Sequence, residues 1–269
     1  MLNPRHCLPA ALLALSAAWP AAAQDLQPHR AAYSVSMLER GKPGVSTPGT
    51  YAFELKATCE DYVVSQRMRL EVEGSRGGIV SEQQSLMTES RDGRKLRFEH
   101  RSIANGRTVS EFKGEATIDD DGRGQARFSE PEGQTVALPA GTLFPIAIAR
   151  ATLRRAKAGE TGFDALFFFG EKVKPPQSVN VVLGRVPKRL ADLKIPDGAE
   201  ALADGHTRVY YRGAFFDTQP KGQGEQAAFE MNSLTLDNGI ELYGTHEEGE
   251  GGIQYRITRL ESLPKPACN

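Results

Sequence analysis

Apolar and polar side chains alternate along most of this chain with a period of two residues. Tyr51, Phe53, Leu55 and Ala57, for example, are separated by small or charged residues. Successive side chains of a β-strand point to opposite faces, so this pattern predicts strands with one face in a core. Dipeptides that fit tight hairpin turns separate many of the runs: Asp92-Gly93, Asn105-Gly106, Asp121-Gly122, Asp204-Gly205 and Asn238-Gly239. The sequence therefore predicts an all-β fold, a single curled antiparallel sheet or barrel of about a dozen strands or more.

One segment, residues 142–158, has a helical pattern instead. Its apolar residues fall on one face and its basic residues crowd the last turns, where the helix dipole favours cations. Thr142 is the expected N-cap, Pro145 fits the first turn, and Gly159 is the expected stop. Because strand-like runs lie on both sides, the apolar face of this amphipathic helix should pack on a sheet. We expect the helix across the opening of the barrel or on its concave face.

The first residues are typical of a secretory signal peptide. Arg5 and His6 precede an apolar run from Leu8 to Trp19, and Ala21-Ala22-Ala23 forms a small-residue cleavage site. A transmembrane anchor is the alternative, but it needs roughly 20 apolar residues, and this run is shorter and broken by Pro9 and Pro20. We expect residues 1–23 to be removed and the mature chain not to span a membrane.

The mature chain, residues 24–269, is expected to form a single domain. Loss of Arg5 leaves 32 Lys and Arg against 34 Asp and Glu, a formal charge of −2. Basic and acidic residues are interleaved, so the chain lacks the basic patch that nucleic acid requires. Nucleic acid is therefore excluded as the expected partner.

Two cysteines remain after removal of Cys7 with the signal peptide. In an exported protein Cys59 and Cys268 are read first as a disulfide, which would tie the end of the chain to its first third. A redox pair and a metal site are the alternatives. The chain has no C-x-x-C motif, and no histidine stands at ligand spacing from either cysteine.

Residues that could carry catalysis are scattered. The four remaining histidines, His29, His100, His206 and His246, form no metal motif and are interpreted as surface or loop side chains. Neither a Gly-x-Ser-x-Gly elbow nor a phosphate-binding glycine loop is present. We expect no catalytic residue, no cofactor and no metal.

The run Phe167-Phe168-Phe169 is apolar on both faces of its predicted strand. Such a strand is either buried on both sides or lines a cavity. Core packing is one interpretation. The other is an apolar ligand site in the barrel mouth, with these candidate lining residues: Phe144, Ile146, Leu153, Phe167 and Phe169.

Several segments resemble the EipB-type cell-envelope integrity proteins of Gram-negative bacteria, long catalogued as a domain of unknown function. They are Pro28-His29-Arg30-Ala31-Ala32-Tyr33, Cys59, the helix opening from Leu138 to Pro145, and the closing stretch from Leu260 to Cys268. The resemblance implies a periplasmic protein whose strands coil as a β-spiral around an amphipathic helix, with a disulfide between Cys59 and Cys268. It also implies a role in maintaining the envelope under stress, without a known enzymatic activity.

These observations favour a monomeric, non-enzymatic periplasmic protein that maintains the cell envelope by binding a ligand or partner through its β-scaffold. One form of this hypothesis is a carrier or sensor of a lipid-like or peptide ligand in an apolar lumen. A second makes the exterior a docking surface for an envelope-assembly protein. A third, an envelope hydrolase, needs a nucleophile and a base that the fold brings together.

Overall fold

The fold is described by a computed structural model, which covers residues 25–39, 42–72, 78–218, 226–249 and 251–268. The predicted signal peptide, residues 1–23, lies outside these described residues. Within them nearly all the regular structure is β, and fifteen strands belong to one curled sheet. This confirms the predicted fold class.

The strands come in two groups along the chain, separated by the helix α1 (Pro145–Lys157). The first group is β1 (His29–Glu39), β2 (Lys42–Ala57), β3 (Asp61–Val72), β4 (Ile79–Ser90), β5 (Lys95–Ala104), β6 (Arg107–Ile118), β7 (Gly124–Glu130), β8 (Thr135–Leu138) and β9 (Thr142–Leu143). The second is β10 (Gly162–Phe167), β11 (Gln177–Gly184), β12 (Arg208–Phe216), β13 (Phe229–Leu236), β14 (Glu241–Glu248) and β15 (Gly251–Ser262). A four-residue helix α2 (Lys188–Ala191) and a 3-10 turn (Glu200–Leu202) lie between β11 and β12.

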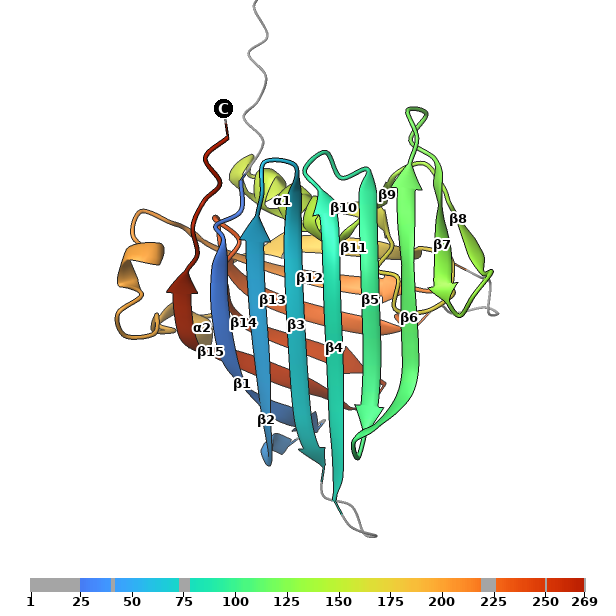
Figure 1. Ribbon diagram of the computed structural model, residues 1–269. Coiled ribbons are helices and arrows are strands. Elements are labelled where there is room, and N and C mark those ends of the chain that lie inside the picture. The colour runs from blue at the N-terminus through green and yellow to red at the C-terminus, as the bar shows by residue number, and fades with distance from the viewer. Residues whose placement is uncertain (1–24, 40–41, 73–77, 219–225, 250, 269) are drawn as a thin grey trace, which may run out of the picture.

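The sheet consists of two antiparallel meanders that meet at the pair β1–β15. Its order runs from β8 down to β1, continues with β15, and then runs down to β9. The strands β8 and β9 are neighbours in sequence, yet they form the two edges of the sheet. In Figure 1 the long strands β1–β6 form a wall facing the viewer, and strands of the second meander cross behind it. The chain therefore curls around an interior.

Helix α1 lies in this interior, between the two walls at the upper end of the view in Figure 1. Ile146 and Leu153 pack into the core cluster of the first wall. Ile148 packs against the cluster of β11 and β12, around Val179 and Phe215. The helix thus supports both meanders from inside the sheet. This agrees with the expectation, drawn from the strand-like runs on both sides of the helix in the sequence, that its apolar face packs on a sheet.

The start of the helix differs from the prediction. The helix begins at Pro145 with Phe144 as N-cap, and no side chain of the cap accepts a hydrogen bond. Thr142 lies in β9, where its hydroxyl donates to the carbonyl of Pro139. The free N–H groups of Ile146 and Ala147 donate instead to the two carboxylate oxygens of Glu89, each at 2.7 Å. Because Glu89 comes from β4, local sequence could not reveal this cap.

The disulfide between Cys59 and Cys268 is confirmed, with the two Cα atoms 5.5 Å apart. Cys59 lies in the turn between β2 and β3, and Cys268 follows β15. Strands β14 and β15 pair as a hairpin, with Glu248 opposite Gly251. No helix in the described part of the chain has the length and apolarity to cross a membrane.

The outward face of the first meander is a lattice of charged side chains that pair across strands. Arg67 pairs with Glu82, and Glu111 accepts from both Arg101 and Lys113, with N–O distances of 2.7 to 2.8 Å. Exposed ion pairs of this kind contribute little stability each, but they leave few unmatched charges. The outside of this wall is therefore a self-neutralised, solvated surface.

Candidate functional site

An interior cavity of about 140 Å³ lies beneath helix α1. The helix contributes Ala149 and Leu153, the first meander contributes His29, Tyr33 and Phe53, and Leu26 precedes it. The remaining lining comes from the second meander: Tyr211, Thr235, Gly239 and Glu241. The cavity is therefore bounded by all three parts of the fold and includes several polar side chains.

Glu241 reaches this cavity because of a β-bulge. Thr235 of β13 pairs with Glu241 of β14, whereas the preceding residue, Leu234, pairs with Tyr243, so Leu242 is an extra residue. A bulge shifts the alternation of faces by one residue. Thr235 and Glu241 therefore share the inward face, while Tyr243, two residues after Glu241, contacts Arg189 of helix α2 instead.

The carboxyl group of Glu241 lies deep in the protein and accepts hydrogen bonds from two hydroxyl groups. Ser233 and Tyr255 both donate to its Oε1 atom. Burial raises the pKa of Glu241 to about 7, although both hydrogen bonds act in the opposite direction. The Glu241 residue keeps some accessible surface and lines the cavity, so this carboxyl can exchange a proton near neutral pH.

His29 presents an unused hydrogen-bonding atom to the interior. The side chain has no exposed surface, and Nδ1 lies 2.7 Å from the carbonyl oxygen of Gln27, so Nδ1 carries the hydrogen. Nε2 is buried and has no partner in the described part of the chain. Burial lowers the pKa of His29, so the ring is neutral at pH 7 and Nε2 is an acceptor. The surface position expected for His29 is wrong, and so is that expected for His100, which is also buried.

Thr235 adds a second such atom, because its Oγ1 is buried and unpartnered among the described residues. Gly239 lines the cavity at the tip of the β13–β14 turn, with φ at +90°. A Cβ atom there would lie 2.7 Å from Leu26, so this turn requires glycine at that position. The turn dipeptide was visible in the sequence, but its role in shaping the cavity was not.

The five residues predicted to line an apolar ligand site do not all line one cavity. Leu153 lines the cavity. Phe144 and Ile146 are buried in the core of the first wall. Phe167 packs with Phe215, and the half-buried Phe169 packs on His100, whose Nε2 is within 2.9 Å of the Phe169 carbonyl. A ligand role for these aromatic residues stays a prediction.

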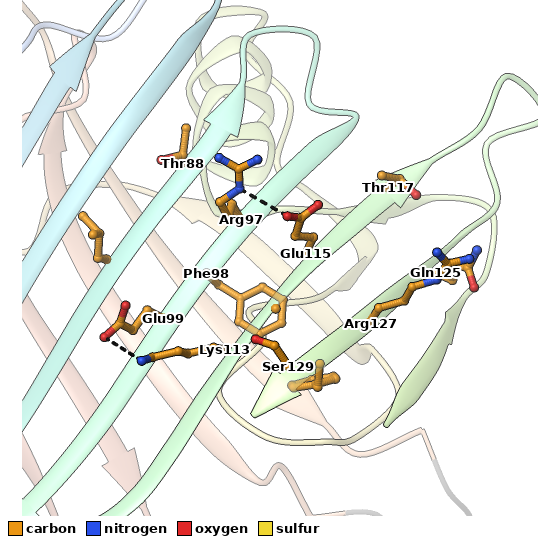
Figure 2. Close-up of a pocket in the computed structure, with 13 residues that line it drawn as sticks. Thr88, Arg97, Phe98, Glu99, Lys113, Glu115, Thr117, Gln125, Arg127 and Ser129 are labelled. Carbon is orange, nitrogen blue, oxygen red and sulfur yellow. Dashed lines mark ion pairs between the residues drawn. The ribbon is translucent and has the colours of Figure 1, made fainter. Parts of the chain in front are cut away.

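A larger basin of about 680 Å³ lies on the outward face of β4–β7 (Figure 2). Figure 2 shows Arg97 pointing toward Glu115 and Lys113 toward Glu99, with N–O distances of 3.5 and 3.6 Å. Gly114 is among the lining residues, and a Cβ atom there would be 2.3 Å from the carbonyl oxygen of Arg127. Because these charges are paired with one another, the interior cavity is the stronger candidate site.

Comparison with known proteins identifies the family. The model of the EipB-like family matches residues 20–264 of this chain. The chain belongs to the EipB-like family. A curated relative, the cell envelope integrity protein EipB of Brucella abortus (strain 2308), is 26% identical over 261 residues, which cover 91% of this chain and 87% of that protein. This confirms the family resemblance inferred from the sequence.

A crystal structure of a β-barrel-like protein of a domain of unknown function, also from Brucella abortus, has the same fold. Its TM-score is 0.77 at 23% sequence identity, and the match covers 90% of the EipB-like chain and 100% of the other. The name of the curated relative supports a role for the family in cell-envelope integrity.

The buried carboxyl of this EipB-like chain predicts a pH dependence of stability. Since the pKa of Glu241 rises to about 7 on folding, the unfolded chain releases this proton at lower pH than the folded one. Below the pKa of the unfolded chain, Glu241 is protonated in both states and does not lower the free energy of unfolding. As pH rises from there to about 7, ionisation in the unfolded chain lowers the free energy of unfolding by roughly 3 kcal/mol in total. Glu241→Gln should remove this loss and be more stable than the wild type at pH 8.

Urea unfolding at pH 5 and pH 8 measures the effect. Glu89, whose pKa burial also raises to about 7, leaves a residual slope in the Glu241→Gln variant. Glu247→Gln is the matched control, because Glu247 lies on the same strand and does not line the cavity. Equal pH slopes for wild type and Glu241→Gln would contradict the assignment.

Proposed function

We propose that the chain loses residues 1–23 on export and works in the periplasm as a single-domain, non-enzymatic binding protein that maintains the cell envelope. The family and the named role of the Brucella abortus relative support the envelope role. The sequence of the first 23 residues supports export. The ligand, in this proposal, occupies the interior cavity.

One observation carries the binding part: two buried polar atoms without partners, His29 Nε2 and Thr235 Oγ1, belong to side chains that line the same cavity. Buried polar atoms are nearly always hydrogen bonded, and each one left unsatisfied costs about 1–3 kcal/mol. A bound polar molecule would satisfy both atoms. None of the side chains that line the outward basin has such an atom among the described residues.

The size of the cavity favours a small ligand over the lipid-like or peptide ligand expected from the sequence. Pockets for drug-sized ligands have volumes of roughly 300–1,000 Å³, and this cavity has about 140 Å³. Its lining also includes a carboxyl group and an imidazole, which a lipid chain would leave unsatisfied. The proposal is therefore narrowed to a small polar molecule.

Docking of an envelope-assembly protein is a second candidate, supported by the outward basin. Leu86 lines it with 49% of its surface exposed, among charged side chains of both signs. An apolar residue inside a polar ring is typical of a protein contact. The hydrolase hypothesis has weaker support: Ser233 does bond to Glu241, but no hydrogen bond joins His29 to a serine or threonine hydroxyl in the described residues.

Filling the cavity tests the proposal in cells. A strain depleted of this protein should become sensitive to detergents and cell-wall antibiotics, and the wild-type gene should restore resistance. Ala149→Leu places three additional carbon atoms into the cavity from helix α1. We expect this variant to fold, with a melting temperature within a few degrees of the wild type, and to fail to restore resistance.

Ala158→Leu is the matched control, since Ala158 is exposed at the end of the same helix. It should restore resistance fully. Full resistance with a folded Ala149→Leu variant would show that the cavity is not needed, and the outward basin would become the leading candidate.

A further inference from the structure

Glu241 is an acidic group that lines a cavity and has no basic partner among the described residues. The groups that surround it are phenols, hydroxyls and a neutral imidazole, from strands β1, β2, β12, β13 and β15: Tyr33, Tyr51, Tyr211, Tyr255, Ser233 and His29. Among the described residues, no lysine or arginine lines the cavity. Buried charges in proteins are normally paired, so the site lacks one positive charge.

Other acidic side chains of the chain show the contrast. The half-buried Glu54 bonds to Arg30 and Lys56. The buried Glu89 accepts from two backbone N–H groups and is also stabilised by the nearby charge of Arg150. Glu241 accepts hydrogen bonds from two neutral hydroxyls and has no such cation.

Aromatic rings around Glu241 add to the preference for a cation. Tyr33 stacks on Tyr51 with centroids 5.1 Å apart, and Tyr255 meets both rings edge-on at 5.7 and 5.5 Å. Tyr33, Tyr211 and Phe53 also line the cavity. The faces of such rings carry negative charge and attract ammonium groups. An anion would meet a carboxyl group and ring faces, and it would find no lysine or arginine among the described lining residues.

The unpartnered atoms specify the kind of cation. His29 Nε2 is an acceptor, because Nδ1 carries the hydrogen, and Thr235 Oγ1 can accept as well. A primary ammonium group has three N–H donors, enough for a carboxylate and both acceptors. A quaternary ammonium has none and would leave these atoms unsatisfied.

The volume and the apolar part of the lining limit the rest of the molecule. A cavity of about 150 Å³ in another protein holds one benzene molecule, and the cavity here is about 140 Å³. Leu26, Phe53 and Leu153 form its apolar surface. We infer that the cavity binds a small primary ammonium compound of about six non-hydrogen atoms, with its charge on Glu241, its N–H groups on His29 and Thr235, and its short carbon chain on the apolar surface. This inference rests on the proposed binding function and names its ligand class.

Isothermal titration calorimetry of the mature protein with n-butylammonium chloride tests the inference. Binding should be detectable at pH 8 and roughly tenfold weaker at pH 6, because the cation requires ionised Glu241 and must displace its proton at low pH. At pH 6 the measured heat should change between buffers of different ionisation enthalpy, which reports the released proton. The neutral 1-butanol and the anionic butyrate should bind at least tenfold more weakly than the amine.

Glu241→Gln should lower the affinity for n-butylammonium at least tenfold at pH 8 and abolish its pH dependence, while Glu247→Gln should bind as the wild type does. Thermal unfolding of each variant shows that it is folded. Equal binding of 1-butanol and the amine, or unchanged binding by folded Glu241→Gln, would overturn the cation assignment and leave the cavity as a site for a neutral ligand. No binding of the amine to the wild type would also overturn it. The two proposals fail separately. Full resistance of the strain that carries Ala149→Leu would overturn the proposed function, whereas the amine inference depends only on the calorimetry of the wild-type protein and its Glu241→Gln variant.

Discussion

Replacing Cys59 and Cys268 by serine should lower the free energy of unfolding by up to roughly 5 kcal/mol, because the bridge closes a loop of more than two hundred residues in the unfolded chain. The two residues are 209 positions apart and both are exposed. Loss of an exposed bridge removes little packing, so the effect should come from the unfolded state. Urea unfolding of the oxidised wild type and the double variant measures the difference.

The folded sheet should not need the bridge. The last paired residues of β15 are held by β1, with Ser262 opposite His29, and the N–H of Leu263 donates to the carbonyl of Pro28. Far-UV and near-UV circular dichroism should therefore be unchanged in the double variant. Dithiothreitol should destabilise the wild type to the same extent and have no effect on the variant. A loss below 1 kcal/mol, or a change of fold on reduction, would contradict the loop-closure explanation.

The sequence predicted those parts of the fold that depend on local patterns. The alternation of apolar and polar residues, with Asn-Gly or Asp-Gly turns between the runs, predicted the antiparallel meanders. Gly159, with φ at +75°, ends helix α1 as expected. The single parallel pair among the described strands, β9 with β10, was missed because β9 has two residues and shows no period. The predicted N-cap, Thr142, lies two residues before the observed N-cap, Phe144, because the carboxylate that accepts from the first helical N–H groups, Glu89, lies on a distant strand.

The candidate site was less accessible to sequence analysis. Glu241 was not singled out, because a period of two assigns it to the same face as Tyr243, and the bulge at Leu242 places the two on opposite faces. His29 stands at the first position of β1, where an apolar pattern cannot yet be seen. The alternation of Ala31, Tyr33 and Val35 behind it was the available signal, since it places His29 on the inward face.

Leu153→Asp should unfold the protein. Leu153 is 3% exposed, belongs to the core cluster of the first wall, and lines the cavity from helix α1. Truncating a buried leucine alone costs about 2–5 kcal/mol, and a carboxyl group in that position adds its desolvation. Glu241 also lines this cavity, so a second acidic group there would be disfavoured further. Domains typically have only about 5–15 kcal/mol of stability, so we expect loss of the near-UV circular dichroism signal and of cooperative unfolding.

Arg154→Ala is the matched control, because Arg154 is the next residue of the helix and its side chain is exposed. It should change the free energy of unfolding by no more than about 0.5 kcal/mol. Leu153→Met, which conserves volume, should cost less than about 1.5 kcal/mol. If helix α1 were only a detachable lid, Leu153→Asp would release it and leave the two meanders folded, with most backbone amides of β1–β6 still protected from hydrogen exchange. Since Ile146 and Ile148 of the helix pack into the cores of opposite walls, we expect that protection to be lost throughout the sheet.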